Sequence, residues 1–433
     1  MRRVSRPGGS GGRAGSLIRI LAMAVPVGVL LLVVLLTDAG DASAASVEAY
    51  DATRDAGLEF SGNTYGATIA DLDADGDEDL LEVRHYFRGG PTLFENLGGG
   101  AFADRGSAFG ISGRTDFHGC DVADVNQDGR ADVYCALGGK KGGTAANAKR
   151  LYLAQPQGGY VDVAEQWGVQ DEFGRGREVS FIDADGDEYP DLFVGNNPKR
   201  MDGQPSPNRF FLNDGGERFV EQPGFGLNGR YGADFDAQAV DYDRDGFEDL
   251  LVCSPSGVHL FRNRSNRRFE DVSDRTGHEG GCKSAELAQL GGDRDLDLAV
   301  LGRDRLEVRI ARPGGFARAP AYERSVENAR ALAVGDVDAD GLGDIYVVRH
   351  GRYVKDAEYD HRDDTPDLML RNRRSGTRFT RLAVPPIRRG VGQSVIGFDH
   401  DADGRDAFLV MNGFNKAEGP IKLIAFRDAL RGG

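Results

Sequence analysis

Residues 71–80, DLDADGDEDL, carry the pattern from which the fold of this chain can be read, because the pattern recurs. Five copies keep the form Asp-x-Asp/Asn-x-Asp-x-x-x-Asp and then an aliphatic residue. They begin at Asp71, Asp124, Asp183, Asp241 and Asp336. Two imperfect copies, QLGGDRDLDL and DHDADGRDAF, begin at Gln289 and Asp399, and successive copies start 47 to 63 residues apart. A period of this size predicts one supersecondary unit repeated in a propeller or solenoid.

Each copy, here called an Asp loop, spaces its carboxylates as a calcium ion requires. Calcium takes six to eight oxygens in a flexible shell. We expect side chains at positions one, three, five and nine, and the backbone carbonyl at position seven, to supply them. The expected ligands in the five intact loops are Asp71, Asp73, Asp75, Asp77, Asp79, Asp124, Asn126, Asp128, Arg130, Asp132, Asp183, Asp185, Asp187, Tyr189, Asp191, Asp241, Asp243, Asp245, Phe247, Asp249, Asp336, Asp338, Asp340, Leu342 and Asp344.

The departures from the pattern set the expected number of calcium ions at about five. The fifth loop has Gln289 and Gly291 in place of carboxylates and is expected to be empty. The seventh loop is one residue short, so a sixth site is left open. Its candidate ligands are Asp399, Asp401 and Asp403. Position six favours glycine because a left-handed turn is cheapest without a Cβ. The third loop has Glu188 there and is expected to be strained or differently shaped.

Short apolar runs flank the loops, which indicates that each loop joins two strands. Runs such as LLEV (80–83) and IYVV (345–348) follow the loops, and a third strand then ends in an aromatic-Asn phrase such as TLFEN (92–96). A fourth strand follows, as in FVEQ (219–222). Four short antiparallel strands with polar turns are typical of a propeller blade. The alternative is that Asp and Gly merely form good turns, but five loops in register favour ion binding.

The two ends of the chain predict how the ring closes. Residues 47–58 resemble the fourth-strand phrase at 269–277, whereas the last repeat offers only three strands, at 394–398, 407–411 and 421–426. An N-terminal strand that completes the last blade removes an open sheet edge. The expected fold is therefore all-β, a seven-bladed propeller of four-stranded antiparallel blades over residues 46–428.

The Asp loops together with the aromatic-Asn phrases resemble the FG-GAP/VCBS repeats, the blade type of integrin α-subunit heads and of cartilage-acidic-protein-like secreted proteins. The resemblance covers residues 47–426. It implies a calcium-binding β-propeller whose loops hold the ion at the positions named above. Members of this family serve in adhesion, in ligand binding and occasionally as enzymes, so the resemblance indicates the fold better than the function.

The composition and the N-terminus indicate where the protein works. The formal net charge of −16 argues against nucleic acid as a partner. Residues 1–19 hold five arginines and no acid, and residues 20–36 form an apolar run. Ala42-Ser43-Ala44 resembles a signal-peptidase site, so residues 1–45 are expected to be a cleaved signal or, alternatively, a membrane anchor at 20–36. Both place the propeller outside the cytoplasm, as a secreted, periplasmic or cell-surface protein.

The four cysteines fit an oxidising compartment and allow three disulfide pairings. Cys120 and Cys135 lie on the strands that flank the second loop, while Cys253 ends one blade's second strand and Cys282 precedes the next blade's first. Pairing 120–135 with 253–282 is favoured. A zinc site is the alternative, although the sequence has no CxxC spacing.

Long connections opposite the Asp loops are the expected place for a ligand, because loops on a rigid scaffold often carry function. We expect a monomer that binds a protein or a glycan there. The residues suited to contact it are Tyr86, Arg88, Lys140, Lys141, Asn196, Lys199, His350, Tyr353 and Asn412.

The alternative is a glycan- or polysaccharide-acting enzyme with its site among the same connections. The sequence has no nucleophile elbow, metalloprotease helix or phosphate loop. The residues that could form a catalytic or metal cluster are His350, Asp356, Glu358, Asp360, His361, Asp363 and Asp364.

Overall fold

The computed structural model describes residues 46–62, 64–84, 87–88, 91–106, 114–138, 148–199, 203–227, 229, 236–265, 268–349, 366–386, 392–413 and 419–429. The chain divides into two units, Met1–Ala44 and Ala45–Gly433, and the described residues belong to the second. The expected targeting segment, with its apolar run at 20–36, lies outside them. Within the described ranges, no helix is long and apolar enough to cross a membrane.

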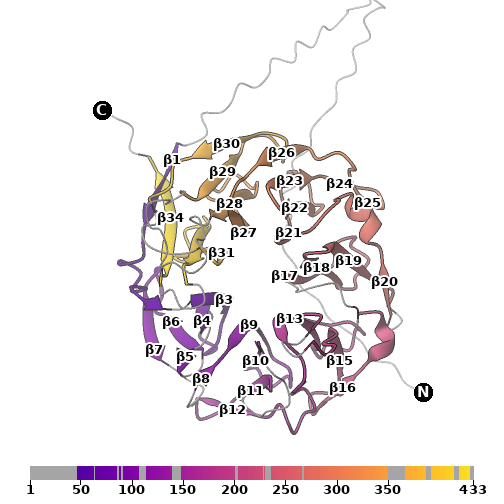
Figure 1. Ribbon diagram of the computed structural model, residues 1–433. Coiled ribbons are helices and arrows are strands. Elements are labelled where there is room, and N and C mark those ends of the chain that lie inside the picture. The colour runs from indigo at the N-terminus through magenta and orange to yellow at the C-terminus, as the bar shows by residue number, and fades with distance from the viewer. Residues whose placement is uncertain are drawn as a thin grey trace, which may run out of the picture. The chain divides into compact units, whose positions relative to one another are not determined.

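The second unit contains seven four-stranded antiparallel sheets, which confirms the predicted seven-bladed propeller (Figure 1). From first to fourth strand, blade one consists of β3 (Thr64–Ala70), β4 (Asp79–Arg84), β6 (Thr92–Asn96) and β7 (Phe102–Gly106), blade two of β9 (Phe117–Ala123), β10 (Asp132–Leu137), β11 (Arg150–Ala154) and β12 (Tyr160–Asp162), and blade three of β13 (Gly176–Ile182), β14 (Asp191–Asn196), β15 (Arg209–Asn213) and β16 (Phe219–Glu221). Blade four consists of β17 (Asp236–Val240), β18 (Asp249–Ser254), β19 (Gly257–Asn263) and β20 (Phe269–Asp271), and blade five of β21 (Ser284–Ala288), β22 (Asp297–Leu301), β23 (Arg305–Arg309) and β26 (Tyr322–Ser325). Blade six consists of β27 (Ala329–Gly335), β28 (Asp344–Arg349), β29 (Leu368–Asn372) and β30 (Phe379–Leu382), and blade seven of β31 (Ser394–Phe398), β32 (Ala407–Met411), β34 (Lys422–Asp428) and β1 (Val47–Asp51).

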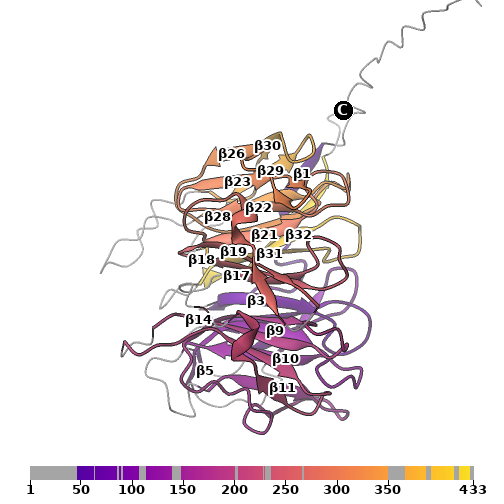
Figure 2. The ribbon, with the colours of Figure 1, turned by 90° about the vertical axis from the view of Figure 1, so that its right-hand side faces the viewer.

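The first strands of the blades line the centre of the ring. Each of them contacts the first strand of the next blade, and β31 of the last blade contacts β3 of the first. The view turned by 90° shows connecting loops projecting on both sides of the ring (Figure 2). The ring therefore has two faces, one formed by the loops after the first strands and the other by the connections between second and third strands.

The second strands are buried along almost their whole length because neighbouring blades cover both sides of each sheet. Every residue of β4, β10 and β18 is buried. One hydrophobic cluster joins Tyr134 of the second blade to Val194 of the third, and another joins Phe94 of the first blade to Leu409 of the seventh. This explains why the runs after the Asp loops are apolar without alternation.

The N-terminal strand closes the ring, as predicted. β1 is antiparallel to β34, with pairs from Val47↔Asp428 to Asp51↔Ile424. Ion pairs add to the ladder, and one joins Arg427 to Glu48 at 2.8 Å. Val47 and Leu58 are buried, so the N-terminal segment contributes to the core as well as to the sheet.

Elements outside the blades are short. Three two-stranded sheets pair β2 (Ser61–Gly62) with β33 (Gly419–Pro420), β5 (Phe87–Arg88) with β8 (Arg114–Thr115), and β24 (Ala311–Arg312) with β25 (Gly315–Phe316). The 3-10 turns are η1 (Pro223–Phe225) and η2 (Ser273–Thr276).

Both disulfides of the favoured pairing are present. Cys120 of β9 is bonded to Cys135 of β10, and Cys253 of β18 to Cys282, which precedes β21. The first bond links two strands of one blade, whereas the second links the fourth blade to the fifth. The four cysteines are therefore all used in disulfides rather than in a zinc site.

Carboxylates on the first strands tie neighbouring blades together. Asp236 of β17 accepts the Ala285 N–H of β21 at 3.1 Å, and Glu286 of β21 accepts the Val334 N–H of β27 at 3.0 Å. Burial raises the pKa of Glu286 to about 8, and the negative charge of Asp236 adds to this rise. The ionised form of Glu286 is therefore unfavourable in the folded protein.

We predict that Glu286→Gln stabilises the protein considerably more at pH 8 than at pH 5. Because the folded pKa of Glu286, about 8, lies above the usual value near 4.3, the folded state holds more protons than the unfolded state, and stability falls as pH rises through this window. Glutamine keeps the acceptor for Val334 but cannot ionise. We expect a gain of about 1 kcal/mol or more at pH 8 in urea unfolding.

The control is Glu217→Gln, because Glu217 is an exposed residue of the turn between β15 and β16. Its effect should be small and the same at both pH values. A Glu286→Gln variant whose urea midpoint shifts equally at pH 5 and pH 8 would contradict the assigned role.

Candidate metal centre

All seven Asp loops lie on one face of the ring, because each connects the first strand of its blade to the second. The first loop runs from the end of β3 to the start of β4, and the other six occupy the same place in their blades. The connections from second to third strands lie on the opposite face. The repeat thus sets a circle of similar acidic loops around one end of the central channel.

The loops share one backbone shape, with left-handed residues at positions four and six. Position four has a positive φ in every loop, as in Ala74 (64°) and Gly292 (76°). Position six is left-handed in six loops, and Glu188 (69°) adopts this conformation without being glycine. The third loop therefore has the common shape at the cost of backbone strain. The fifth loop, with Arg294 at position six, departs from it.

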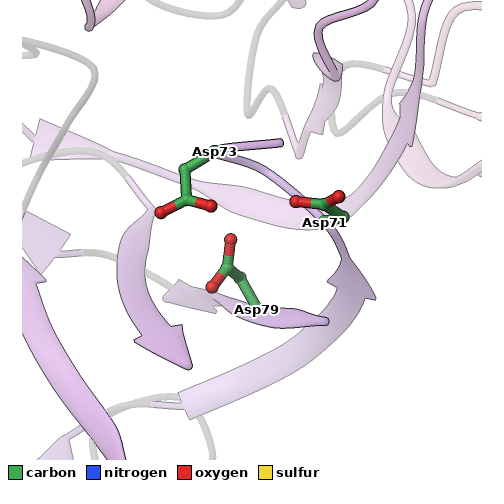
Figure 3. A group of neighbouring side chains, drawn as sticks. All are labelled: Asp71, Asp73 and Asp79. Carbon is green, nitrogen blue, oxygen red and sulfur yellow. The ribbon is translucent and has the colours of Figure 1, made fainter. Parts of the chain in front are cut away.

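Five loops bring three carboxylates together. In each group, oxygen atoms of the three side chains lie within 4.8 Å of one another. Figure 3 shows the carboxylates of the first group turned toward a common centre. Four groups combine positions one, three and nine, and the fifth combines positions one, three and five. The groups are Asp71, Asp73 and Asp79; Asp183, Asp185 and Asp191; Asp241, Asp243 and Asp249; Asp336, Asp338 and Asp344; and Asp399, Asp401 and Asp403.

Position five lies differently from the sequence expectation in the four complete groups. Asp75 is not part of the first group, and its Oδ1 accepts the Asp77 N–H at 3.0 Å. The corresponding bond recurs in the third loop, where Asp187 accepts the Tyr189 N–H at 3.0 Å. In the structure, position five thus shapes the turn, as position one also does by accepting the Gly76 N–H at 3.1 Å. The converging groups consist of positions one, three and nine.

The second loop, expected to be complete, forms no such group among the described residues. Asn126 stands at position three, and its Nδ2 donates to Asp128 at 3.1 Å. The guanidinium of Arg130 also pairs with Asp128, at 2.5 Å. A neutral amide and a bound arginine thus reduce the negative charge that this loop can offer a cation.

In the seventh loop, where a sixth site was left open, the three candidate acids converge. The short spacing moves Asp406 out of the loop. Its Oδ2 accepts the Asp336 N–H of the sixth loop at 2.7 Å, and its own N–H donates to the Asp336 carbonyl at 2.9 Å. Asp406 thereby joins the seventh loop to the sixth.

Position nine has a structural role that the sequence did not reveal. Asp79 is fully buried, and its two oxygens accept the N–H groups of Leu72 at 2.9 Å and Asn96 at 2.8 Å. Asp297 keeps this role in the fifth loop, where it accepts the Ala311 N–H at 2.8 Å. The carboxylate at position nine therefore holds the loop to the third strand whether or not the loop has ligands at positions one and three.

The asparagine that ends several third strands joins the loops of adjacent blades. The Nδ2 of Asn213 in the third blade donates to the Val125 carbonyl in the second loop at 2.8 Å and to Pro190 in its own loop at 3.1 Å. Asn263 reaches Ala184 of the third loop at 2.9 Å in the same way. The aromatic-Asn phrase of the sequence is thus a clamp between neighbouring loops.

Burial and neighbouring negative charges raise the pKa values of several loop carboxylates. Burial raises the pKa of Asp79 to about 6 and the pKa values of Asp191 and Asp344 to about 8. Burial also raises the pKa of Asp73, and the charge of Asp75 adds to the rise. Ionised carboxylates are unfavourable in these positions without a compensating positive charge.

Two of the groups receive an arginine from the third strand of their own blade. Arg262, directly before Asn263, pairs with Asp243 at 2.6 Å and with Asp245 at 2.8 Å. Arg371, directly before Asn372, pairs with Asp338 in the sixth loop. A guanidinium paired with the position-three carboxylate would compete with a cation for that carboxylate.

The other two complete groups have no arginine at the corresponding position. The residue before the clamping asparagine is Glu95 in the first blade and Leu212 in the third. Among the four complete groups, those of the first and third loops are therefore the ones whose position-three carboxylate forms no ion pair with an arginine of the third strand in the described structure. A cation from solution would meet the least competition there.

The donor set fits calcium. The groups offer carboxylate oxygens alone, which hard cations such as calcium prefer, whereas zinc favours nitrogen and sulfur. In the seventh loop, Asp401 Oδ1 is buried and has no hydrogen-bond partner among the described residues, as expected of an oxygen reserved for a cation. In a calcium complex, positions one, three and nine would hold the ion, and the ion would neutralise the charge that burial makes unfavourable.

The opposite face is described only in part. Asn196 and Asn412, expected to contact a ligand, are instead buried, which corrects that expectation. Asn196 Nδ2 donates to Asp171 at 2.9 Å, and Asn412 Nδ2 to the Pro420 carbonyl at 2.9 Å. Lys199 is exposed. The remaining candidates lie outside the described side chains: Tyr86, Arg88, Lys140, Lys141, His350 and Tyr353, together with Asp356, Glu358, Asp360, His361, Asp363 and Asp364 of the alternative enzyme site.

A cavity of about 300 Å³ opens in the central channel. It is lined by residues near the start of six first strands and by Lys283, which directly precedes β21, so it lies toward the face opposite the Asp loops. Its wall includes Arg177, Lys283 and Arg330 together with Glu178 and Asp236. The channel therefore presents both signs of charge to a small polar group.

The chain is similar to one family of repeats and to solved structures. Residues 71–135, 183–252 and 241–300 match the FG-GAP-like repeat. No curated protein matches the chain. Among solved structures, it is similar to an Agrocybe aegerita lectin studied for its recognition of non-reducing terminal N-acetylglucosamine, at 18% identity over 73% of this chain and 79% of that chain, with a TM-score of 0.48. It is also similar to a chain of the BBS1N–ARL6DN complex soaked with lead, at 10% identity over 86% of this chain and 94% of that chain, with a TM-score of 0.48. The matched segments contain the first five Asp loops.

Proposed function

Because this chain is an FG-GAP β-propeller protein, we propose that it works outside the cytoplasm as a calcium-binding module for a protein or glycan ligand. The Asp loops hold calcium on one face of the ring. The opposite face, with the longer connections and the mouth of the channel cavity, takes the ligand. The protein acts by binding and not by catalysis.

One observation carries the calcium assignment, namely that three carboxylates converge in five loops on the same face. A single acidic turn needs no ion, but repeated convergence of charges within 4.8 Å, with buried position-nine groups, favours a bound cation. Calcium bound between first and second strands stiffens the five blades that carry a carboxylate group. The hydrogen bonds that Asn213 and Asn263 donate to the loops of the preceding blades extend this stabilisation from one blade to the next.

The ligand assignment rests on geometry and charge. The face opposite the loops is carried on a rigid ring, and the cavity there offers guanidinium, ammonium and carboxylate groups. Such a mixed polar wall suits hydroxyl-rich or charged ligands better than apolar ones. Glycan-array binding by the protein in calcium buffer separates the two ligand classes.

The extracytoplasmic assignment draws on the disulfides and the N-terminal sequence. Disulfide bonds persist in oxidising compartments and are rare in the cytosol, and all four cysteines are paired. The basic and then apolar residues 1–36 suit an export signal or anchor. Calcium is also abundant outside cells, at concentrations that weak extracellular sites require.

We predict that Asp73→Asn and Asp185→Asn each remove one bound calcium ion. Both residues stand at position three of loops that receive no arginine from the third strand, so the loss of their charge is not offset within the loop. Elemental analysis after dialysis against ~1 mM calcium, together with calorimetric titration, measures the number of ions.

The control is Asp293→Asn in the fifth loop, which also removes one negative charge from an acidic turn. This loop forms no three-carboxylate group among the described residues, so the ion count should not change. An equal loss of calcium in all three variants, or a wild-type protein that binds no calcium, would refute the proposal.

A further inference from the structure

An ion pair between the third and fourth strands recurs around the rim of the ring. In each case an arginine meets a carboxylate across the outer two strands of one blade, or at their connecting turn. The pairs are Arg105–Glu95 in blade one, Arg150–Asp162 in blade two, Arg209–Glu221 in blade three, Arg264–Glu270 in blade four, Arg305–Glu323 in blade five and Arg427–Glu48 in blade seven. Six blades thus neutralise at least one outer arginine internally.

The sixth blade breaks this rule. Residues 368–398, which include its outer strands β29 and β30, contain seven arginines and no aspartate, glutamate or lysine. Arg373, Arg374, Arg378 and Arg381 are exposed. The guanidinium of Arg373 donates to the Thr380 hydroxyl at 3.1 Å. Within the part of the chain that the structure describes, none of the four pairs with a carboxylate.

The exposed arginines form a continuous stripe with the neighbouring blade. The Arg373 N–H donates to the Arg378 carbonyl at 2.7 Å, so these two residues face each other across the β29–β30 turn. The rings of Tyr322 in β26 and Phe379 in β30 are 4.6 Å apart, which places the outer strands of blades five and six side by side. Arg324 of β26 is exposed as well. We name Arg324, Arg373, Arg374, Arg378 and Arg381 the blade-six stripe.

Asp340 of the sixth Asp loop lies close enough to Arg373 for the two charges to attract each other. The other acids near the stripe are already engaged or lie at one end of it. Glu323 pairs with Arg305, and the buried Asp367 accepts the Tyr346 hydroxyl at 3.0 Å. Glu327 is exposed beside Arg349, whose Nε donates to the Glu327 carbonyl at 3.1 Å. Burial lowers the pKa of Arg349, and Arg381 is the next contributor to that lowering, which shows that positive charge accumulates there.

We propose that the blade-six stripe is a docking site for an acidic polysaccharide, a chain that carries carboxylate or sulfate groups at regular intervals. A guanidinium binds such groups through two parallel hydrogen bonds, and the stripe presents arginine without lysine. Its length along two outer strands suits a linear polyanion. One end of the stripe, at the β29–β30 turn, lies beside the fifth and sixth Asp loops. The proposed contacts are made by guanidinium groups alone, so they do not rest on the calcium assignment.

A membrane surface fits the stripe less well. Peripheral proteins usually add apolar anchors to a basic patch. The large hydrophobic residues exposed in the described structure, Leu97, Val161, Phe173 and Val220, all lie in the first three blades. The stripe therefore offers charge and hydrogen-bond donors without groups that would enter a lipid layer.

The test is binding of the protein, in calcium buffer, to heparin and to alginate, with Kd measured over a series of NaCl concentrations. The triple variant Arg374→Gln/Arg378→Gln/Arg381→Gln is expected to weaken binding about tenfold or more. It should also lower the slope of log K against log salt, because a complex with fewer arginine contacts releases fewer counterions when it forms. The matched control Arg105→Gln/Arg264→Gln/Arg427→Gln removes the same charge from paired rim arginines and should change Kd less than twofold. Melting curves verify that both variants are folded.

Several results would overturn the proposal. One is that the protein binds neither polysaccharide at low salt. Another is that the stripe variant and the control lose the same amount of binding affinity. A third is that the protein binds vesicles of phosphatidylglycerol and phosphatidylcholine more tightly than it binds the polysaccharides. The last result would assign the stripe to a lipid surface. A protein that binds polysaccharide through the stripe but binds no calcium would refute the calcium proposal alone.

Discussion

Removal of calcium is expected to lower the melting temperature of the protein by roughly 5 °C. Extracellular sites bind calcium with dissociation constants near 0.1–1 mM. At ~1 mM calcium, a site with a constant of ~0.1 mM contributes about 1.4 kcal/mol to the free energy of unfolding. The first, third and seventh loops form carboxylate groups without an arginine from the third strand, and together they contribute about 4 kcal/mol. That is a large share of the 5–15 kcal/mol typical of domains.

Thermal unfolding followed by circular dichroism, with ~1 mM calcium and with excess EDTA, measures this effect. Adding calcium back to the chelated sample should restore the original curve, and magnesium at the same concentration should restore less of it, because magnesium demands a tighter octahedral shell. A melting curve that does not change after elemental analysis has verified removal of the metal would exclude calcium as a stabilising ligand.

Deletion of residues 1–58 is expected to abolish the stable fold, whereas deletion of residues 1–45 should preserve it. The longer deletion removes β1 and leaves β34 as an open edge. It also removes the buried side chains of Val47 and Leu58, together with the ion pair between Asp51 and Lys422 at 2.7 Å. Loss of the two apolar side chains alone costs roughly 3–6 kcal/mol.

Gel filtration and thermal unfolding of the two deletion proteins, made in parallel, test this expectation. The longer deletion should aggregate, because an unpaired edge strand recruits other chains. Adding a synthetic peptide of residues 46–58 should recover part of the soluble protein if strand pairing is the cause. Equal melting temperatures for the two proteins would show that the ring closes without β1.

The blades could be predicted from the sequence because the Asp loops repeat with a strand on either side. The run at 80–83 lies within β4 (Asp79–Arg84), and the phrase at 92–96 coincides with β6 (Thr92–Asn96). The short pairs, such as β2 with β33, were not predictable. Two residues carry no periodic signal, and β2 and β33 are also far apart in sequence.

The candidate metal centre was predictable at positions one and three but not in its contacts. The pattern alone does not show that Asp79 accepts two backbone N–H groups, because Asn96 reaches it only through the register of β6. The competing arginines were also missed, although a signal exists. Arg262 and Arg371 each directly precede the clamping asparagine, where the third blade has Leu212.

The pairing of β1 with β34 also fixes the order in which the chain can fold. Glu48 meets Arg427 across 379 residues of sequence. At the usual 5–20 residues per second of synthesis, β1 waits roughly 20–80 s for its partner. Contacts of such long sequence separation form slowly and late. The first strand of the chain is thus the last to be placed, and until then the seventh blade can recruit a β1 from another chain, which makes domain-swapped assemblies the characteristic misfolded product.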